Sequence, residues 1–381
     1  MIPVAKPTFN EEEIDALVAA LRSGWLTQGP RVQAFEEAFA AYTGAAHAIA
    51  VSSGTAALHL ALLAAQIGPG DEVLCPSMSF IATANAIVHA GATPVFAEVG
   101  WENGNLDPRD VERRITPKTK AVILVHQNGM PADLDTFKAL CDAKQLVLIE
   151  DAACAAGSSY KGAKIGLPHG MVCFSFHPRK VITTGEGGMI TTNDPEYANR
   201  LRLLRHHAMS VSDRDRHHAK TVTIERYLTV GYNYRMSDLH AALGIPQLRK
   251  LDAIVEDRRA IARQYDEAFN GLEAVRVIRE PAGCVSNYQS YALCVEPHSP
   301  MGRNALMQHL LDRGIASRRG VMTAHREPAY AAFGVKLPLS EDLSDYSILL
   351  PLYVPMDEAD IDKVIDAVST AVAVRKQRIA V

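Results

Sequence analysis

Short apolar segments recur along the first half of the chain, and stretches with the apolar spacing of helices separate them. Their repeat of roughly 25 residues is typical of strand–helix–strand units. The segments are apolar on both faces, which favours a mostly parallel sheet covered by helices. The expected strands are Ala48–Val51, Glu72–Cys75, Pro94–Glu98, Ala121–Val125, Leu146–Glu150, Val172–Phe176 and Gly188–Thr192, and the expected helices include Glu11–Ser23, Ala56–Ala65, Ala82–Ala90 and Asp135–Ala143.

The pattern changes after residue 245, where charged residues become denser and the strand–helix alternation ends. The elements expected there are a long charged helix at Leu248–Phe269, a strand at Tyr291–Val295, and helices near Asn304–Arg313 and Glu358–Val374. We therefore predict an α/β protein with a large domain at residues 1–247. A smaller α+β domain would occupy residues 248–381.

Composition and charge exclude several classes of protein. The chain has 381 residues, of which 48% are hydrophobic, enough to bury one large core and a smaller second one. A net charge of −4 gives no electrostatic attraction to nucleic acid or to an anionic membrane. No apolar run reaches transmembrane length, and the N-terminal segment lacks the pattern of a secretion signal. Six scattered cysteines without a C-x-x-C pair favour reduced thiols in a cytoplasmic protein.

The segment FSFHPRKVITTGEGGMI (174–190) begins as a buried strand and then places Lys180 on an irregular loop with three glycines. In open parallel sheets, ligands bind beyond the carboxyl ends of the strands. A lysine in a partly apolar cleft can lose its proton and act as an amine nucleophile, for example toward an aldehyde. Ser175, five residues earlier, is a candidate phosphate ligand.

Two other expected strands end in residues that suit the same kind of ligand. Ser53, Gly54 and Thr55 open a helix, whose free N–H groups attract an anion, although this pattern alone is more often an ordinary N-cap. Glu150 and Asp151 close a buried strand, where a carboxylate needs a positive partner. This carboxylate forms a salt bridge, caps a helix, or holds a cationic ring nitrogen. An anion site, an acidic strand end and a cleft lysine together match pyridoxal 5'-phosphate.

The whole chain resembles the DegT-type nucleotide-sugar aminotransferases (the DegT/DnrJ/StrS family), which have the fold of aspartate aminotransferase. The lysine loop followed by GEGG is the most specific part of this resemblance. The matching segments are SGWLTQGPRVQAFEEAFAAYTG (23–44), VSSGTAALHLAL (51–62), PSMSFIATANAIVHAGATPVF (76–96), LIEDAACAAGSSYKG (148–162), SFHPRKVITTGEGGMI (175–190), GYNYRMSDLHAALG (231–244) and LLPLYVP (349–355).

The resemblance implies roles for individual residues. Lys180 would bond covalently to the cofactor's aldehyde, and Asp151 would pair with its ring nitrogen. The other implied cofactor contacts are Phe80 on the ring face, Gly54, Thr55 and Ser175 at the phosphate, and Asn233 from the neighbouring subunit. That last contact makes a homodimer with shared active sites the smallest active unit. By composition alone, Phe80 reads equally as a core aromatic, and Asn233 as an amide that orders a loop.

The chain departs from the family pattern at two places near the expected site. Cys154 stands where the family often has Gln, and a thiol is a poor donor to the cofactor's phenolic oxygen. Asn128 lies in a Gln-Asn-Gly segment where the family often reads Leu-Tyr-Gly, which affects the hexose pocket. His325 and Arg319 are the remaining candidate substrate contacts, although surface solvation explains Arg319 equally well.

The basic segment His206–Arg226 is interpreted either as a lid over a diphosphate or as a solvated loop. It contains paired histidines at 206–207 and 217–218. Adjacent side chains on a helix or strand point apart, and no carboxylate or thiol partner is evident. We therefore expect no metal site.

The resemblance implies transfer of an amino group from L-glutamate to a keto sugar carried on a nucleotide. A 4-keto-6-deoxy hexose is the expected acceptor, and a 3-keto sugar or a cyclitol ketone is the alternative. Lys180 favours amino transfer, because some relatives that act as dehydratases carry His in its place. Two other functions stay open: a lyase that uses the same cofactor, and a non-catalytic regulator of the same fold.

Overall fold

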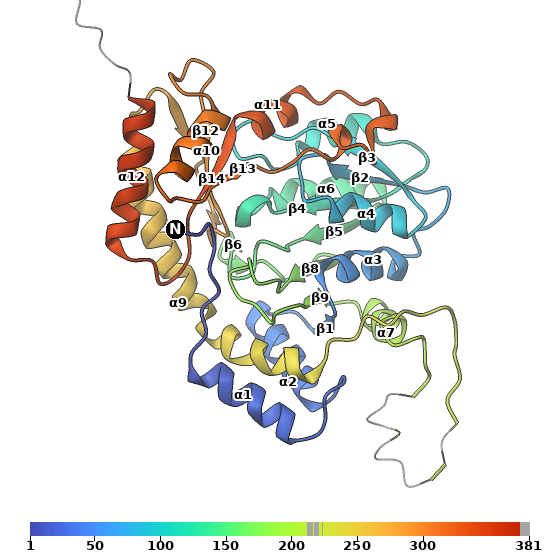
Figure 1. The fold of residues 1–381 in the computed structure, drawn as a ribbon. Coiled ribbons are helices and arrows are strands. Elements are labelled where there is room, and N and C mark those ends of the chain that lie inside the picture. Colours follow the sequence, from blue (N-terminus) through green and yellow to red (C-terminus); the bar gives the residue numbers. More distant parts are fainter. Residues whose placement is uncertain (212–215, 217–220, 223, 374–381) are drawn as a thin grey trace, which may run out of the picture.

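The computed structural model describes residues 1–211, 216, 221–222 and 224–373. Its main sheet has seven strands in the order β1-β9-β8-β5-β4-β2-β3 (Figure 1). These strands are β1 (His47–Val51), β2 (Glu72–Pro76), β3 (Thr93–Ala97), β4 (Thr119–Val125), β5 (Val147–Asp151), β8 (Met171–Ser175) and β9 (Gly188–Thr192). Only β9 runs antiparallel to its neighbours in this sheet. The expected α/β fold with a mostly parallel sheet is thus confirmed.

Helices cover both faces of this sheet, because consecutive strand residues point to opposite sides. On β4, Ile123 packs in one apolar cluster, whereas Val122 and Leu124 pack in the other. The first cluster includes helices α3 (Gly54–Ala64), α4 (Ala82–His89) and α7 (Pro195–Leu204). The second includes α2 (Pro30–Thr43), α5 (Pro108–Arg114), α6 (Leu134–Lys144) and the first half of α9 (Asp238–Phe269).

The N-terminal helix α1 (Glu11–Arg22) begins with a capping box. The Asn10 side chain accepts a hydrogen bond from the backbone of Glu12, and the Glu13 carboxylate accepts one from the backbone of Asn10. Its apolar stripe is only partly covered, because Ile14 and Leu21 are about half exposed in the single chain.

Helix α9 is longer than the sequence predicts. It begins at Asp238, where Ser237 caps it, and not at Leu248. Pro246 lies inside the helix and is buried; a proline removes one hydrogen bond, but packing against the sheet holds this turn in place. The boundary expected between residues 247 and 248 falls within this helix, and the division into two domains stays a prediction.

The C-terminal part forms a second, antiparallel sheet of four strands in the order β10-β12-β14-β13, beside the far end of α9 (Figure 1). Its core is distinct from the two clusters of the main sheet. The elements are β10 (Val275–Val277), β12 (Tyr291–Val295), β13 (Arg318–Arg319), β14 (Ser347–Leu350), α10 (Arg303–Asp312), α11 (Pro338–Tyr346) and α12 (Glu358–Val372).

A third, three-stranded sheet of order β11-β6-β7 connects the two parts. It pairs β6 (Ser159–Tyr160) and β7 (Ala163–Lys164) from the large part with β11 (Cys284–Val285). Three short 3₁₀ helices complete the fold: η1 (Gln127–Gly129), η2 (Ala324–Arg326) and η3 (Ala331–Phe333). Within the described ranges, no helix is both long and apolar enough to cross a membrane.

Candidate active site

The loops that follow β5 and β8 bring Lys180 and Cys154 together. The Nζ atom of Lys180 donates a hydrogen bond to the Sγ atom of Cys154 over 3.2 Å. Lys180 is half-buried, and Cys154 lies three residues after Asp151, the last residue of β5. Lys180 lies 26 residues from Cys154 in the sequence, and the adjacent parallel strands β5 and β8 bring both to one edge of the sheet with Asp151.

Asp151 is a buried carboxylate whose two oxygens are both bound by neutral donors. The Thr83 hydroxyl donates to Oδ2 over 2.7 Å, and the backbone N–H of Ala153 donates to Oδ1 over 3.1 Å. Only 6% of the residue is exposed, and within the part of the chain that the structure describes it forms no salt bridge. A buried carboxylate without a cation is costly, so this position is suited to a cationic ligand.

The start of α3 offers unpaired backbone donors next to Ser175. Ser53 caps the helix and accepts a hydrogen bond from the N–H of Ala56 over 3.1 Å. The N–H groups of Gly54 and Thr55, the two residues just before Ala56, have no acceptor within the helix. A methyl group on Gly54 would approach the Cβ of Ser175 to 2.8 Å, so this glycine allows the helix to sit directly against Ser175. Gly54, Thr55 and Ser175 therefore form one potential anion site.

Phe80 and Asn233 are both exposed in the single chain. Phe80 lies between β2 and α4 and is 68% exposed, so the interpretation as a core aromatic is wrong. Asn233 lies on an extended segment that pairs with His206, and the neighbouring carbonyl of Tyr234 accepts a hydrogen bond from the N–H of Ser52. This segment thus borders the start of α3 in its own chain.

The three candidate substrate residues lie in different surroundings. Asn128 is half-buried in η1 with a left-handed backbone. His325 is buried, with Nδ1 2.5 Å from Ser77 Oγ and Nε2 3.1 Å from Glu341 Oε1, so both ring nitrogens have protein partners. Arg319 is exposed and forms an ion pair with Glu327 at 3.3 Å.

Much of the proposed lid lies outside the described residues, including the histidine pair 217–218. His206 is buried, and its Nδ1 atom accepts a hydrogen bond from the guanidinium of Arg235 over 2.7 Å. Among the residues that the structure places, no group of three or more His, Cys, Asp or Glu side chains could hold a metal ion.

The structure adds three residues that the sequence analysis missed. Thr83 holds Asp151, and Ser79 lies 2.8 Å from Thr83 through their hydroxyl oxygens. Ser79 and Thr83 lie four residues apart in the segment PSMSFIAT (76–83), which begins at the end of β2. Two hydroxyls at this spacing after a strand were a signal that the sequence offers. Asn287, by contrast, donates from the C-terminal part to the carbonyls of Cys154 and Ala156, and nothing local in the sequence indicates this contact.

His177 is the titratable neighbour of Lys180 with a clear shift. Burial lowers the pKa of His177, and the nearby cations Arg179 and Lys180 lower it further, whereas Glu186 opposes them. His177 also accepts a hydrogen bond from the backbone N–H of Arg179 through Nδ1. The neutral ring is therefore the favoured form beside Lys180, and it adds no positive charge there.

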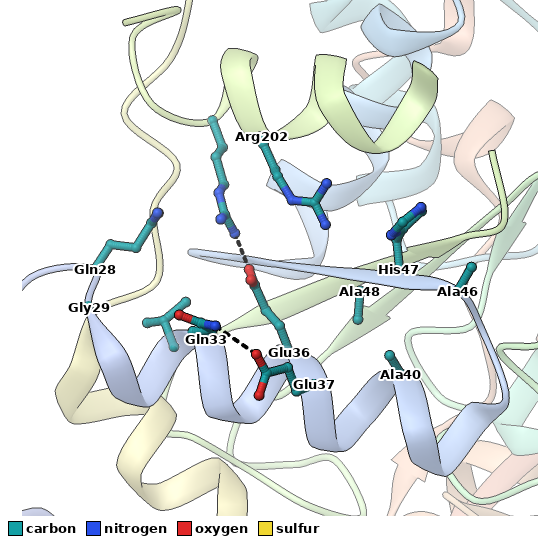
Figure 2. Close-up of a pocket in the computed structure, with 12 residues that line it drawn as sticks. Gln28, Gly29, Gln33, Glu36, Glu37, Ala40, Ala46, His47, Ala48 and Arg202 are labelled. Carbon is teal, nitrogen blue, oxygen red and sulfur yellow. Dashed lines mark hydrogen bonds and ion pairs between the residues drawn. The ribbon is translucent and has the colours of Figure 1, made fainter. Parts of the chain in front are cut away.

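A separate hollow of about 370 Å³ lies between α2, β1 and α7 (Figure 2). Arg205 and Glu36 form a buried ion pair at its wall and bind the carbonyl and the N–H of Ala50 on the edge strand β1. Arg202 and His47 point toward its centre in Figure 2. Neither Lys180 nor Asp151 lines this hollow, and we assign it no role in the chemistry of Lys180.

The fold matches solved aminotransferases over nearly their full length. DesV of S. venezuelae, solved with a ketimine intermediate, is 34% identical, covers 98% of this chain and 99% of its own, and has a TM-score of 0.89. Spr1654 of Streptococcus pneumoniae, proposed to be a sugar aminotransferase and solved in its PMP form, is 30% identical over 97% of this chain and 99% of its own, with a TM-score of 0.92. PseC of Helicobacter pylori, an aminotransferase involved in the biosynthesis of pseudoaminic acid, is 28% identical over 97% and 99%, with a TM-score of 0.90.

The class of protein is thus an aminotransferase of the aspartate aminotransferase fold. Residues 7–369 match the DegT/DnrJ/EryC1/StrS aminotransferase family. The chain belongs to this family, and the family resemblance expected from the sequence is confirmed.

Proposed function

We propose that this sugar aminotransferase uses pyridoxal 5'-phosphate to move an amino group from L-glutamate to a keto sugar carried on a nucleotide. The observation that carries this proposal is the amine of Lys180 at the edge of a sheet where Asp151 is buried without a cation. A 4-keto-6-deoxy hexose is the proposed acceptor, and a 3-keto sugar or a cyclitol ketone is the alternative. Both Lys180 and Asp151 are intact, which favours an enzyme over a regulator of the same fold.

The residues present fit the cofactor at each of its three functional groups. Asp151, held by Thr83 and Ala153, would bind the ring nitrogen and keep it protonated. The Gly54 and Thr55 amides and the Ser175 hydroxyl would bind the phosphate. When bound, pyridoxal phosphate supplies an aldehyde that takes up the amino group and a ring that accepts the electron pair of the reacting carbon. Solved forms of Spr1654 with PLP and with PMP support this choice of cofactor.

Lys180 would have two tasks in this reaction. Its amine would hold the cofactor by a covalent bond at the aldehyde, as expected for a lysine at this edge of the sheet. Once an amino donor has displaced it, the same amine would carry a proton to and from the reacting carbon. Cys154, 3.2 Å away, would keep the free amine close to the site. Because the amine of Lys180 would move this proton from one side of the site only, it would also fix the stereochemistry of the product.

A homodimer with shared active sites accounts for the surfaces that the single chain leaves open. Phe80 and Asn233 are exposed. Several large apolar side chains in the segment that precedes Asn233 are exposed as well. These are Val222, Ile224, Tyr227, Leu228 and Val230. Buried apolar area is the main driving force for obligate association, so we propose that a second copy covers this surface. Asn233 would then reach the phosphate of the partner's site.

The proposed compartment is the cytoplasm. All six cysteines are free in the structure, and five of them are buried. Free thiols are typical of proteins in a reducing compartment.

The proposal is tested with purified protein, pyridoxal phosphate and borohydride. We expect a reduced adduct on Lys180 by peptide mass, and an aminated product when L-glutamate and a panel of nucleotide-linked keto sugars are added. Lys180→Ala should lose essentially all turnover, whereas Lys336→Ala, at an exposed lysine, should keep it. Ammonia release without an aminated sugar would indicate a lyase. The absence of any adduct would favour a non-catalytic protein.

A further inference from the structure

One side chain of the C-terminal part binds the backbone on both sides of Lys180. The Gln289 side-chain nitrogen donates a hydrogen bond to the carbonyl of Arg179 over 2.6 Å. Its oxygen accepts one from the N–H of Val181 over 2.9 Å. These two backbone groups belong to the peptide units immediately before and after Lys180. The amide of Gln289 therefore fixes the two peptide planes from which the lysine side chain extends.

The segment that carries Gln289 also holds the opposite side of the lysine contact. The backbone N–H of Gln289 donates to the side-chain oxygen of Asn287 over 2.8 Å. The Asn287 nitrogen donates to the carbonyls of Cys154 and Ala156 over 2.9 and 2.7 Å. Both partners of the 3.2 Å contact between Lys180 and Cys154 are thus attached, through backbone hydrogen bonds, to residues 287–289.

Arg258 anchors this segment to helix α9. Its guanidinium donates to the Tyr288 carbonyl over 3.0 and 2.7 Å and to the Gln289 carbonyl over 2.9 Å. Arg258 is 6% exposed, and in the described ranges it has no carboxylate partner. Tyr288 has a left-handed backbone with a φ of 46°, which is unfavourable for an aromatic residue. Such a conformation persists only where the surroundings hold it firmly, as these bonds do.

We infer that Gln289 is a positioning residue for Lys180. It fixes the backbone of the irregular, glycine-containing loop, so that the amine of Lys180 stays directed toward the edge of the sheet where Asp151 lies. This inference rests on the proposed function, because it assigns Gln289 a part in attaching and using the cofactor. A lysine side chain has four rotatable bonds, so the position of its amine depends strongly on the backbone that bears it. Small errors in such a position reduce rates markedly, even when binding is intact.

A Gln289→Met variant keeps the length of the side chain and removes both hydrogen bonds. We expect pyridoxal phosphate to attach covalently to Lys180 about tenfold more slowly, since two ordinary hydrogen bonds are lost. The rate of attachment is measured by trapping the adduct with borohydride at successive times. The affinity for pyridoxamine phosphate, which has no aldehyde and needs no lysine, should be unchanged. The kcat should fall while the KM for the sugar nucleotide stays the same. Gln308→Met, at an exposed glutamine of α10, is the matched control.

A Gln289→Glu variant provides the second arm if the methionine variant fails to fold. The glutamate still accepts from the Val181 N–H, but its second oxygen faces the Arg179 carbonyl and repels it, so attachment should slow by at least the same factor, about tenfold. Equal attachment rates in the unaltered protein and in either folded variant would overturn the positioning role. A fall in pyridoxamine phosphate affinity that matches the fall in attachment would also overturn it, because it would indicate a general structural role. No adduct on Lys180 in the unaltered protein would instead refute the proposed function, and the positioning role with it.

Discussion

The hydroxyl of Thr83 is the group that we expect to control Asp151 most directly. It donates to Oδ2 of this buried carboxylate over 2.7 Å, while the other oxygen is bound by a backbone N–H that no side-chain substitution can remove. Thr83→Val keeps the shape of the side chain and deletes the donor. Since Thr83 is 1% exposed, water cannot easily replace the lost hydrogen bond.

The magnitude follows from the charge of the acceptor. A hydrogen bond to a charged group contributes about 1.5–3 kcal/mol, so Thr83→Val removes about 2 kcal/mol of the interactions that hold the Asp151 carboxylate in place. Because the carboxylate must be held in place to bind the ring nitrogen, we expect the affinity for pyridoxal phosphate to fall about 30-fold, at 1.4 kcal/mol for each factor of ten. A smaller loss would indicate that the carboxylate has found another donor.

Equilibrium dialysis measures the affinity for the cofactor. The kcat/KM at saturating cofactor measures the activity that remains once the site is filled. Thr83→Ser is the matched control: it loses a methyl group but keeps the hydroxyl, so it should bind the cofactor nearly as well as the unaltered protein. The reasoning would be refuted if Thr83→Val bound the cofactor normally. It would also fail if Thr83→Ser were impaired as strongly as Thr83→Val, because the effect would then come from packing and not from the donor.

Three further outcomes are expected from other parts of the structure. Phe80→Ala should weaken cofactor binding in equilibrium dialysis, because the exposed ring is proposed to contact the cofactor and is not part of the core of the chain; unchanged binding would contradict this role. Glu36→Gln should lower the free energy of unfolding in urea by about 3 kcal/mol, because it leaves the buried Arg205 cation without its partner; an unchanged midpoint would contradict this. Burial alone would raise the pKa of Asp110, but hydrogen bonds from Arg114 and other donors lower it overall. Asp110→Asn should therefore cost stability at neutral pH, and this cost should disappear as the pH falls below about 4, where the unfolded carboxyl is protonated; an equal cost at both pH values would contradict the assignment.

Local pattern accounts for most of the elements and for the position of the site. The apolar runs predict all seven strands of the main sheet within two residues at each end, because burial on both faces requires continuous apolar sequence. The capping box of Asn10 and Glu13 and the N-cap Ser53 are equally local. Lys180 and Asp151 are recognisable because one follows the strand β8 and the other ends the strand β5. These strands are parallel, so their carboxyl ends lie at the same edge of the sheet.

Where the sequence analysis failed, a distant contact had overridden a local signal. The expected helix begins at Leu248, but packing of the preceding residues against the main sheet extends α9 back to Asp238, through Pro246. The alternative interpretation of Phe80 as a core aromatic is also wrong, because its ring is 68% exposed in the single chain.

The amino-acid sequence by itself determined the strand–helix alternation, the helix caps and the chemical types of the reacting groups, since each depends on neighbours within a few residues. Only the tertiary structure decided how those groups are held. Thr83 meets Asp151 across 68 residues, and Gln289 meets the backbone beside Lys180 across 108 and 110. Such contacts have no local signature, because an amide or a hydroxyl has the same appearance in the sequence whether it faces water or a lysine loop.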